Sequence, residues 1–122
     1  MARFVVIDDS KVARNFLRSV LEGAGHEIVA EGVNGLEGFD LYRAHKPDII
    51  TLDVVMPILT GTECLKKIMA DSPDANIIVV TSVGKNILIE ESIKSGAKAV
   101  IVKPFDEGDV LPIVNAILNK ES

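Results

Sequence analysis

Three aspartates at the ends of two short apolar runs are the residues of this chain whose chemistry is most informative. Asp8 and Asp9 follow the run 4–7, and Asp53 follows the run 49–52. Runs of this length and composition are typical of strands that are buried on both faces of a parallel sheet. The carboxyl ends of such strands meet at one edge of the sheet, which is where ligands bind in open α/β folds.

Carboxylates that meet at one edge repel one another. At about 5 Å and an effective dielectric near 20, the repulsion is roughly 3 kcal/mol for each pair. Such a cluster therefore needs a bound cation, a raised carboxyl pKa, or both. Taken alone, Asp8, Asp9 or Ser10 could equally cap a following helix.

Two further polar residues follow apolar runs of the same kind. Thr81 ends the run 77–81, and Lys103 follows the run 100–102. Each is an ordinary strand-end residue when taken singly, but chance would scatter such residues over both edges of a sheet. Together with the aspartates they supply carboxylate oxygens, a hydroxyl and an ammonium, which can bind a divalent cation and a phosphoryl group. Mg²⁺ in particular favours carboxylates combined with water and phosphate oxygens.

The elements that would position these groups alternate between strand-like runs and segments of helical periodicity. Strands are expected at residues 3–7, 27–31, 49–52, 77–81 and 99–102. The alternation predicts right-handed βαβ units, and hence an α/β fold with a doubly wound five-stranded parallel sheet and five helices. With 122 residues, 48% of them hydrophobic, the chain is expected to form one domain over residues 1–122.

Capping residues indicate where the helices begin. Four helices are expected to begin at, or directly after, Ser10, Asn34, Thr60 and Asn86. Glu63 completes a capping box at the third helix, and Gly96 is a natural stop for the fourth. The apolar spacing predicts inward faces made of Val12, Phe16, Val20 and Leu21 in the first helix, Cys64, Leu65, Ile68 and Met69 in the third, and Ile89 and Ile93 in the fourth.

Pro112 bears on the start of the fifth helix. A proline in a helix interior costs about 3 kcal/mol, whereas in the first turn it costs little. If Asp109 is the N-cap, Pro112 falls in the first turn. We therefore expect a late or irregular start to this helix.

Composition excludes several classes of function. The net charge is −5 and no basic stripe is present, which argues against nucleic-acid binding. No apolar run approaches the ~20 residues of a membrane helix and no signal-peptide pattern is present, so a cytoplasmic protein without membrane contact is expected. The single Cys64 is expected to pack in the core. His26 and His45 have no partners at metal-ligand spacing.

The residues at the predicted edge closely resemble the receiver domain of two-component response regulators, in particular the single-domain chemotaxis regulators of the CheY type. The resemblance rests on Ile7-Asp8-Asp9-Ser10, on Asp53-Val54-Val55-Met56-Pro57 followed by Gly61, on Thr81-Ser82 and on Lys103-Pro104-Phe105. These motifs occur in the family's order and spacing over essentially the whole chain. The resemblance implies a flavodoxin-like strand order of 2-1-3-4-5.

The resemblance also implies a role for each acidic residue. Asp53 would be the phosphoacceptor, taking a phosphoryl group from a histidine kinase. Asp9 and Asp53 would bind Mg²⁺ directly, together with the backbone carbonyl of Val55. Asp8 would act mostly through a metal-bound water.

The remaining matched residues would contact the phosphoryl group. Lys103 would pair with one phosphoryl oxygen, and Thr81 would donate its hydroxyl to another. Ser82 could offer a backbone N–H. The peptide bond between Lys103 and Pro104 would be cis, as is usual in the family.

Two features depart from the better-known pattern of the family. Val100 stands where many receivers carry an aromatic switch residue, and a valine cannot swing a ring between buried and exposed positions. Val55 and Val83 stand where side chains influence self-hydrolysis, and neither can orient an attacking water. We therefore expect slow autodephosphorylation and reliance on a separate phosphatase.

The function implied is a phosphorylation-driven switch rather than an enzyme with a separate substrate. Output is expected through a protein partner, with a flagellar motor component as the family-level expectation. The surface expected to bind it is formed by the fourth helix, the fifth strand and the fifth helix, with Ile87 and Leu88 as a modest indication of a docking patch.

Four alternatives remain open to different degrees. The chain could be a stand-alone receiver of another phosphorelay, or a phosphorylation-independent adaptor that keeps only the fold; the intact polar set disfavours the adaptor. An aspartyl phosphatase would need a second carboxylate at Val55. A flavin-binding domain would need a phosphate-binding loop where Asp8 and Asp9 would repel phosphate.

Overall fold

The computed structural model describes residues 1–54, 59–82 and 86–121, the side chains of residues 120 and 121 excepted. Its elements are β1 (Arg3–Ile7), α1 (Lys11–Gly23), β2 (Glu27–Gly32), α2 (Gly35–His45), β3 (Ile49–Asp53), α3 (Gly61–Asp71), β4 (Ile77–Thr81), α4 (Asn86–Lys94), β5 (Ala99–Val102) and α5 (Glu107–Glu121). All strand pairs are parallel and the order is β2-β1-β3-β4-β5. The predicted fold class and strand order are confirmed.

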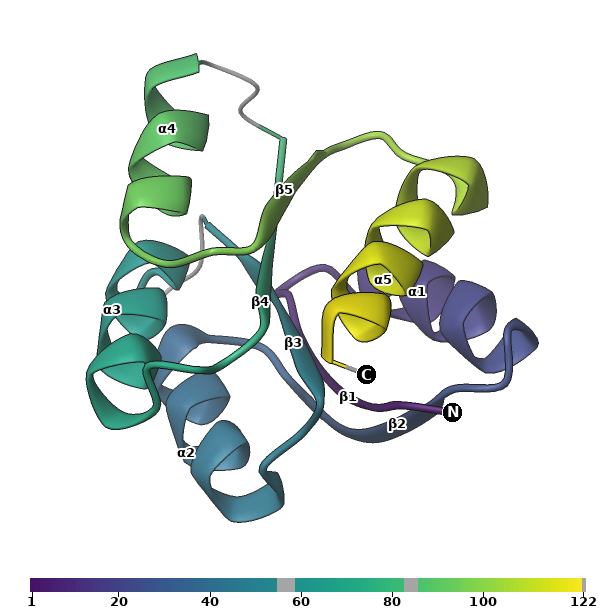
Figure 1. Ribbon diagram of the computed structural model, residues 1–122, viewed down its shortest axis with the longest axis horizontal. Helices are drawn as coiled ribbons and strands as arrows, with labels where there is room; N and C mark the ends of the chain where they lie inside the picture. The colour runs from purple at the N-terminus through teal and green to yellow at the C-terminus, as the bar shows by residue number, and fades with distance from the viewer. Residues whose placement is uncertain (55–58, 83–85, 122) are drawn as a thin grey trace.

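The sheet lies between two layers of helices, with α1 and α5 on one face and α2, α3 and α4 on the other (Figure 1). Successive residues of β1 point to opposite faces, as the pleat of a strand requires. Phe4 and Val6 pack into the core beneath α1 and α5. Val5 and Ile7 pack into the core beneath α2 and α3. This inner strand is therefore apolar on both faces until it reaches its carboxyl end.

Side-chain caps begin three helices where the sequence predicts. The Ser10 hydroxyl accepts a hydrogen bond from the backbone of Ala13 at 3.2 Å and caps α1. Asn34 caps α2 by accepting from the Glu37 backbone at 2.9 Å. A reciprocal capping box at Thr60 begins α3. Each cap satisfies a backbone N–H that has no partner within its helix.

The predicted late start of α5 is wrong. The helix begins at Glu107, because Asp106 and Asp109 form a reciprocal pair. The backbone N–H of Asp109 donates to Asp106 Oδ1 at 3.1 Å, and that of Asp106 donates to Asp109 Oδ2 at 3.0 Å. Pro112 consequently lies inside the helix, in its second turn and on its exposed face.

The predicted inward face of α1 is wrong in part. Val20 and Leu21 are buried as expected, but Val12 is 79% exposed and Phe16 is 39% exposed. Leu17 takes their place in the core. The buried residues Leu17, Val20 and Leu21 form a stripe that is rotated relative to the predicted one. All three lie in the second half of the helix.

The predicted inward face of α4 is also wrong in part. Ile93 is 46% exposed, whereas Ser92 is buried. The Ser92 hydroxyl donates to the carbonyl of Leu88 at 3.0 Å, so a polar residue can face the sheet without leaving its donor unpaired. Leu88 packs against the core and Ile89 is half-buried.

Cys64 is buried, as predicted. Burial raises the pKa of its thiol to about 12, so the nucleophilic thiolate is scarce at neutral pH. Among the residues that the structure describes, no helix combines the length and the apolar character needed to cross a bilayer.

Candidate functional site

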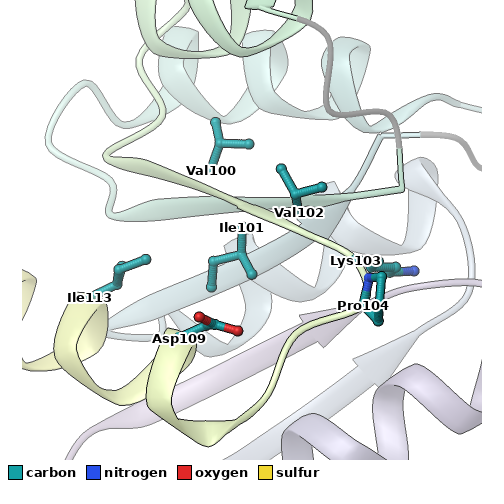
Figure 2. A pocket seen from close by; sticks show the side chains of 7 residues that line it. All are labelled: Val100, Ile101, Val102, Lys103, Pro104, Asp109 and Ile113. Atoms are coloured by element: carbon teal, nitrogen blue, oxygen red, sulfur yellow. The ribbon is translucent and has the colours of Figure 1, made fainter.

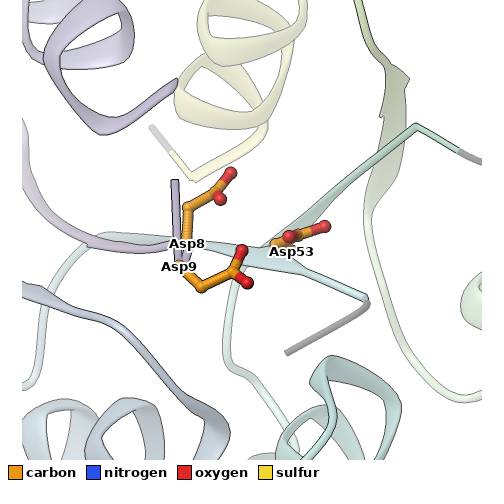
Figure 3. A group of neighbouring side chains, drawn as sticks. All are labelled: Asp8, Asp9 and Asp53. Carbon is orange, nitrogen blue, oxygen red and sulfur yellow. The ribbon is translucent and has the colours of Figure 1, made fainter. Parts of the chain in front are cut away.

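The three predicted aspartates lie together at the carboxyl edge of the sheet. Asp8 and Asp9 follow β1, and Asp53 ends β3 (Figure 3). The strands bring them together because Ile7 lies opposite Leu52 in the parallel pair. One carboxylate oxygen from each aspartate lies within 4.8 Å of the other two. Asp8 and Asp53 are buried, whereas Asp9 is exposed to solvent.

Asp8 is held through both its backbone and its side chain. Its N–H donates to the carbonyl of Gly32 on β2 at 3.1 Å. Its Oδ1 accepts from the backbone N–H of Ser10 at 2.9 Å. The carboxylate therefore supports the first turn of α1 while Ser10 serves as the N-cap. Of the three candidate capping residues Asp8, Asp9 and Ser10, it is Ser10 that caps α1. Its capping role leaves Asp8 available to take part in a cation site.

Lys103 lies among the carboxylates, as predicted. Its Nζ lies 2.7 Å from Asp8 Oδ2 and 3.8 Å from Asp53 Oδ2. The nearer contact is an ion pair rather than a well-directed hydrogen bond. The lysine follows β5 directly, and its own N–H donates to the carbonyl of Thr81 at 2.7 Å. This ammonium offsets part of the repulsion between carboxylates that share a small volume.

Thr81 and Ser82 lie at the same edge. Thr81 is the last residue of β4 and is fully buried, whereas Ser82 is exposed. Asp53 lies opposite Val80 in the pair β3–β4, which places Thr81 one residue further along the neighbouring strand. Four separate segments thus bring the five predicted side chains to one edge of the molecule.

The chemistry of this donor set fits a hard divalent cation. The cluster consists of carboxylate oxygens, which Mg²⁺ prefers, and it has no soft sulfur ligand or histidine among its described members. The exposed Asp9 leaves one side of the cluster open to water, as Mg²⁺ sites require. The residues therefore fit the metal that the sequence predicts.

The peptide bond between Lys103 and Pro104 is cis, as predicted. Beyond it, β5 and α5 line a groove of about 530 Å³ that reaches Lys103 (Figure 2). Val100 and Val102 project from one side of β5 and Ile101 from the other. Val100, at the position of the aromatic switch, is half-buried.

A second, largely apolar groove of about 400 Å³ adjoins Lys103 on the side of α1. The exposed Val12 and Phe16 line it. The ring of Phe16 lies 5.5 Å from that of Phe105, at an interplanar angle of 59°. Val12 and Phe16, which were predicted to face the core, thus border the candidate site instead.

Several predicted features lie outside the described residues. They are the backbone carbonyl of Val55 as a metal ligand, the motif residues Met56 and Pro57, and Val83 as a residue that influences hydrolysis. Val54 is described, and its carbonyl accepts from the N–H of Gly61 at 2.9 Å.

Arg14 is a neighbour of the site that the sequence analysis did not identify. Its Nη1 donates to the backbone carbonyl of Asp8 at 2.5 Å. Its Nε donates to Glu31 on β2 at 3.1 Å. The one signal in the sequence is a basic residue in the first turns of a helix that follows an acidic pair, which is too common to single it out.

Comparison with known proteins agrees with the geometry. The family model described as the response regulator receiver domain matches residues 4–115. Chemotaxis protein CheY of Thermotoga maritima is 38% identical over 115 residues, covering 94% of this chain and 96% of that protein. Chemotaxis protein CheY of Listeria monocytogenes is 40% identical over 111 residues, covering 91% and 93% respectively.

A solved structure, the CheX–CheY–BeF3–Mg²⁺ complex from Borrelia burgdorferi, contains a chain with the same fold. It superposes with a TM-score of 0.93 at 32% identity, and the match covers 95% of this chain and 88% of that one.

Proposed function

The chain belongs to the response regulator receiver domain family, together with several CheY-type chemotaxis regulators, and from this premise we propose that it is a phosphorylation-controlled switch of a two-component system. The observation that carries the proposal is the convergence of Asp9, Asp53 and Lys103, from three segments, in one partly exposed cluster. Residues 1–122 act as one receiver domain in this proposal.

Asp53 is the proposed phosphoacceptor. One carboxylate oxygen attacks the phosphorus of a phosphohistidine on a kinase. A P–O bond forms as the P–N bond breaks, and the leaving imidazole takes up a proton from solvent. The product is an acyl phosphate on Asp53. The chain takes part in its own phosphorylation and dephosphorylation and has no separate substrate.

Asp9 and Asp53 are the proposed direct ligands of Mg²⁺, with the Val55 carbonyl, while Asp8 acts through water. When bound, the metal offsets repulsion and neutralises charge on the phosphoryl oxygens. The crystal structure of the Borrelia burgdorferi complex contains BeF3 and Mg²⁺, which supports Mg²⁺ as the metal.

Lys103, Thr81 and the backbone of Ser82 are the proposed contacts of the phosphoryl group. Lys103 already lies 3.8 Å from Asp53 Oδ2, so a short movement of its ammonium reaches an attached group. Phosphorylation adds negative charge and acceptor oxygens. Moving a two-state equilibrium from 1:99 to 99:1 needs about 5.5 kcal/mol of differential stabilisation, which two or three charge-assisted hydrogen bonds can supply.

The surface of α4, β5 and α5 is the proposed output site. Lys103 and Ile113 both line the groove of Figure 2, so a movement of the lysine alters the same surface that a partner would contact. Ile87, on α4, is 67% exposed. The partners proposed are a histidine kinase, a downstream protein such as a flagellar motor component, and a separate phosphatase.

Mass spectrometry after incubation with acetyl phosphate and Mg²⁺ tests the chemistry. We expect one added phosphoryl group on the wild type and on D40N, which removes an exposed carboxyl group outside the site. We expect none on D53N, and none on the wild type in excess EDTA. Equal labelling of D53N and the wild type would exclude Asp53 as the acceptor.

The adaptor alternative makes the opposite prediction. A phosphorylation-independent adaptor would show no response of its amide NMR spectrum to beryllofluoride with Mg²⁺. A switch would show shifts that extend from Asp53 to β5 and α4.

A further inference from the structure

Arg14 bridges three parts of the molecule next to the carboxylate cluster. It belongs to α1, its Nη1 donates to the carbonyl of Asp8 at 2.5 Å, and its Nε pairs with Glu31 of β2 at 3.1 Å. The Arg14 side chain is 14% exposed and that of Glu31 is 25% exposed. The pair is therefore held between helix and sheet rather than free in solvent, where a salt bridge contributes little.

The oxygen that Arg14 holds belongs to the peptide group that joins Asp8 to Asp9. A peptide group is planar, so fixing its oxygen fixes the plane and the direction in which the chain enters Asp9. The N–H of Asp8 is held by Gly32, and its Oδ1 by Ser10. Asp9 is the exposed member of the cluster, so little packing surrounds its side chain and the backbone sets where that side chain begins.

We infer that Arg14, braced by Glu31, is a positioning residue that orients the Asp8–Asp9 peptide so that both carboxylates serve one divalent cation. The inference rests on the proposed function of the cluster as a cation site. Arg14 acts through the backbone and does not touch the cation.

Electrostatics alone predicts the opposite change in cation affinity when Arg14 is removed. A guanidinium near a cation site repels the cation, so removing its charge alone strengthens cation binding. Removing a residue that orients the ligands weakens it, and loss of such an outer contact typically costs about tenfold or more in metal affinity. The direction of the change therefore separates positioning from bulk electrostatics.

Arg18 provides a matched control. It lies one turn further along α1 and also donates to Glu31, through Nε at 2.8 Å. Its Nη2 donates to the same carboxylate, and its Nη1 donates to Glu22 at 3.1 Å. R14Q and R18Q each remove one positive charge from α1 and one partner from Glu31. Only R14Q also removes the hydrogen bond to the backbone carbonyl of Asp8.

Isothermal titration with MgCl2 tests the inference on the metal-free wild type, R14Q and R18Q. We expect R14Q to weaken Mg²⁺ binding by about tenfold and R18Q to leave it unchanged or slightly tighter. Unchanged or tighter binding by R14Q, alongside normal wild-type binding, overturns the inference alone. No Mg²⁺ binding by the wild type overturns the proposed function as well.

R14K keeps the test decisive if R14Q does not fold. It conserves the charge, but a single ammonium lacks the planar fork that holds a carbonyl and a carboxylate together. We expect Mg²⁺ affinity between those of the wild type and R14Q, and a shift of the Asp9 amide signal in the metal-free protein that R18Q lacks. Wild-type Mg²⁺ affinity in R14K, with an unshifted Asp9 amide signal, would overturn the inference, because the planar fork of Arg14 would then not be needed.

Discussion

Lys103 acts as an internal counterion to the acidic pocket. Its ammonium lies closer to Asp8 than to Asp53, although Asp53 is the proposed phosphoacceptor. The pocket therefore does not hold three uncompensated carboxylates, as the sequence alone suggests, because one of its charges is already paired. A phosphoryl group on Asp53 would compete with Asp8 for this lysine.

The lifetime of the phosphorylated form is a second property of single residues. Val55 cannot hydrogen-bond an attacking water, and asparagine at that position can. We expect V55N to shorten the half-life of the acyl phosphate by about tenfold, or about 1.4 kcal/mol in the barrier. The half-life is measured as the loss of label from purified phosphoprotein. V33N is a suitable control because Val33 is exposed, whereas V54N is unsuitable because Val54 is buried. A wild-type half-life of seconds would contradict slow autodephosphorylation.

His26 makes folding stability depend on pH. Its Nδ1 accepts a hydrogen bond from the N–H of Ala2 at 3.0 Å, and its ring packs against Phe4. Partial burial, followed by the positive N-terminus, lowers the pKa of its imidazole. The unfolded chain therefore binds more protons than the folded one between the folded pKa and the ordinary value near 6.5.

Because the unfolded chain binds more protons in this range, the folding stability rises with pH. The stabilisation is present in full above about pH 6.5 and is lost as the pH falls through the folded pKa. Urea unfolding should show that the free energy of unfolding decreases in this window more steeply for the wild type than for H26Q. Identical slopes for the two proteins would show that His26 does not titrate with folding.

At the scale of the element, the starts of α1, α2 and α3 are predictable from the sequence, and the rotation of α1 and α4 is not. A cap such as Ser10 or Asn34 is a local interaction between residues three apart, so its signal is contained in the sequence. Rotation depends on which side chains fit the sheet. Ser92 could face inward because its hydroxyl bonds to its own helix, and an apolar stripe alone cannot show this.

The start of α5 is set by a local interaction that outweighs the proline. The reciprocal bonds of Asp106 and Asp109 satisfy two N–H groups at the first turn, and they prevail over the later start that Pro112 favours. Pro112 therefore lies inside the helix, where a proline is costly, rather than in its first turn.

The position of Pro112 leads to a prediction about stability. Alanine there restores an N–H for the carbonyl of Gly108, four residues earlier, and removes the clash of the ring. Because proline also restricts the unfolded chain, we expect P112A to raise the free energy of unfolding by a net 1–2 kcal/mol, roughly. Chemical denaturation measures it, with A116G as an opposite control on an exposed helical position. Destabilisation by P112A would mean that the ring makes contacts that offset its cost.

At the scale of the whole molecule, the order of strands places the site. Parallel strands with crossover helices put the ends of β1, β3, β4 and β5 at one edge, and the apolar runs that end in polar residues predicted this. The resemblance supplied the strand order itself, and the alternation of elements did not. The long-range bridge from Arg14 to Glu31 joins residues 17 apart and has no local signature.

Cation binding should stabilise the whole fold, since ligands on β1 and β3 assemble only when the sheet forms. At free Mg²⁺ about 100 times the dissociation constant, the gain is about 2.7 kcal/mol. We expect the thermal midpoint of EDTA-treated protein to rise on adding MgCl2, and D9N to respond much less. An equal rise in both proteins would point to general ionic strength instead of the cluster.

The place of β5 in the sheet has a mechanical consequence. It is four residues long and is bonded along one flank only, to β4, whereas β1 and β3 are inner strands with neighbours on both sides. A border strand loses fewer ladder bonds when it shifts than an inner one does. The aspartates thus follow inner strands and the lysine follows a border strand, so chemistry at the aspartates can be felt as displacement at the lysine.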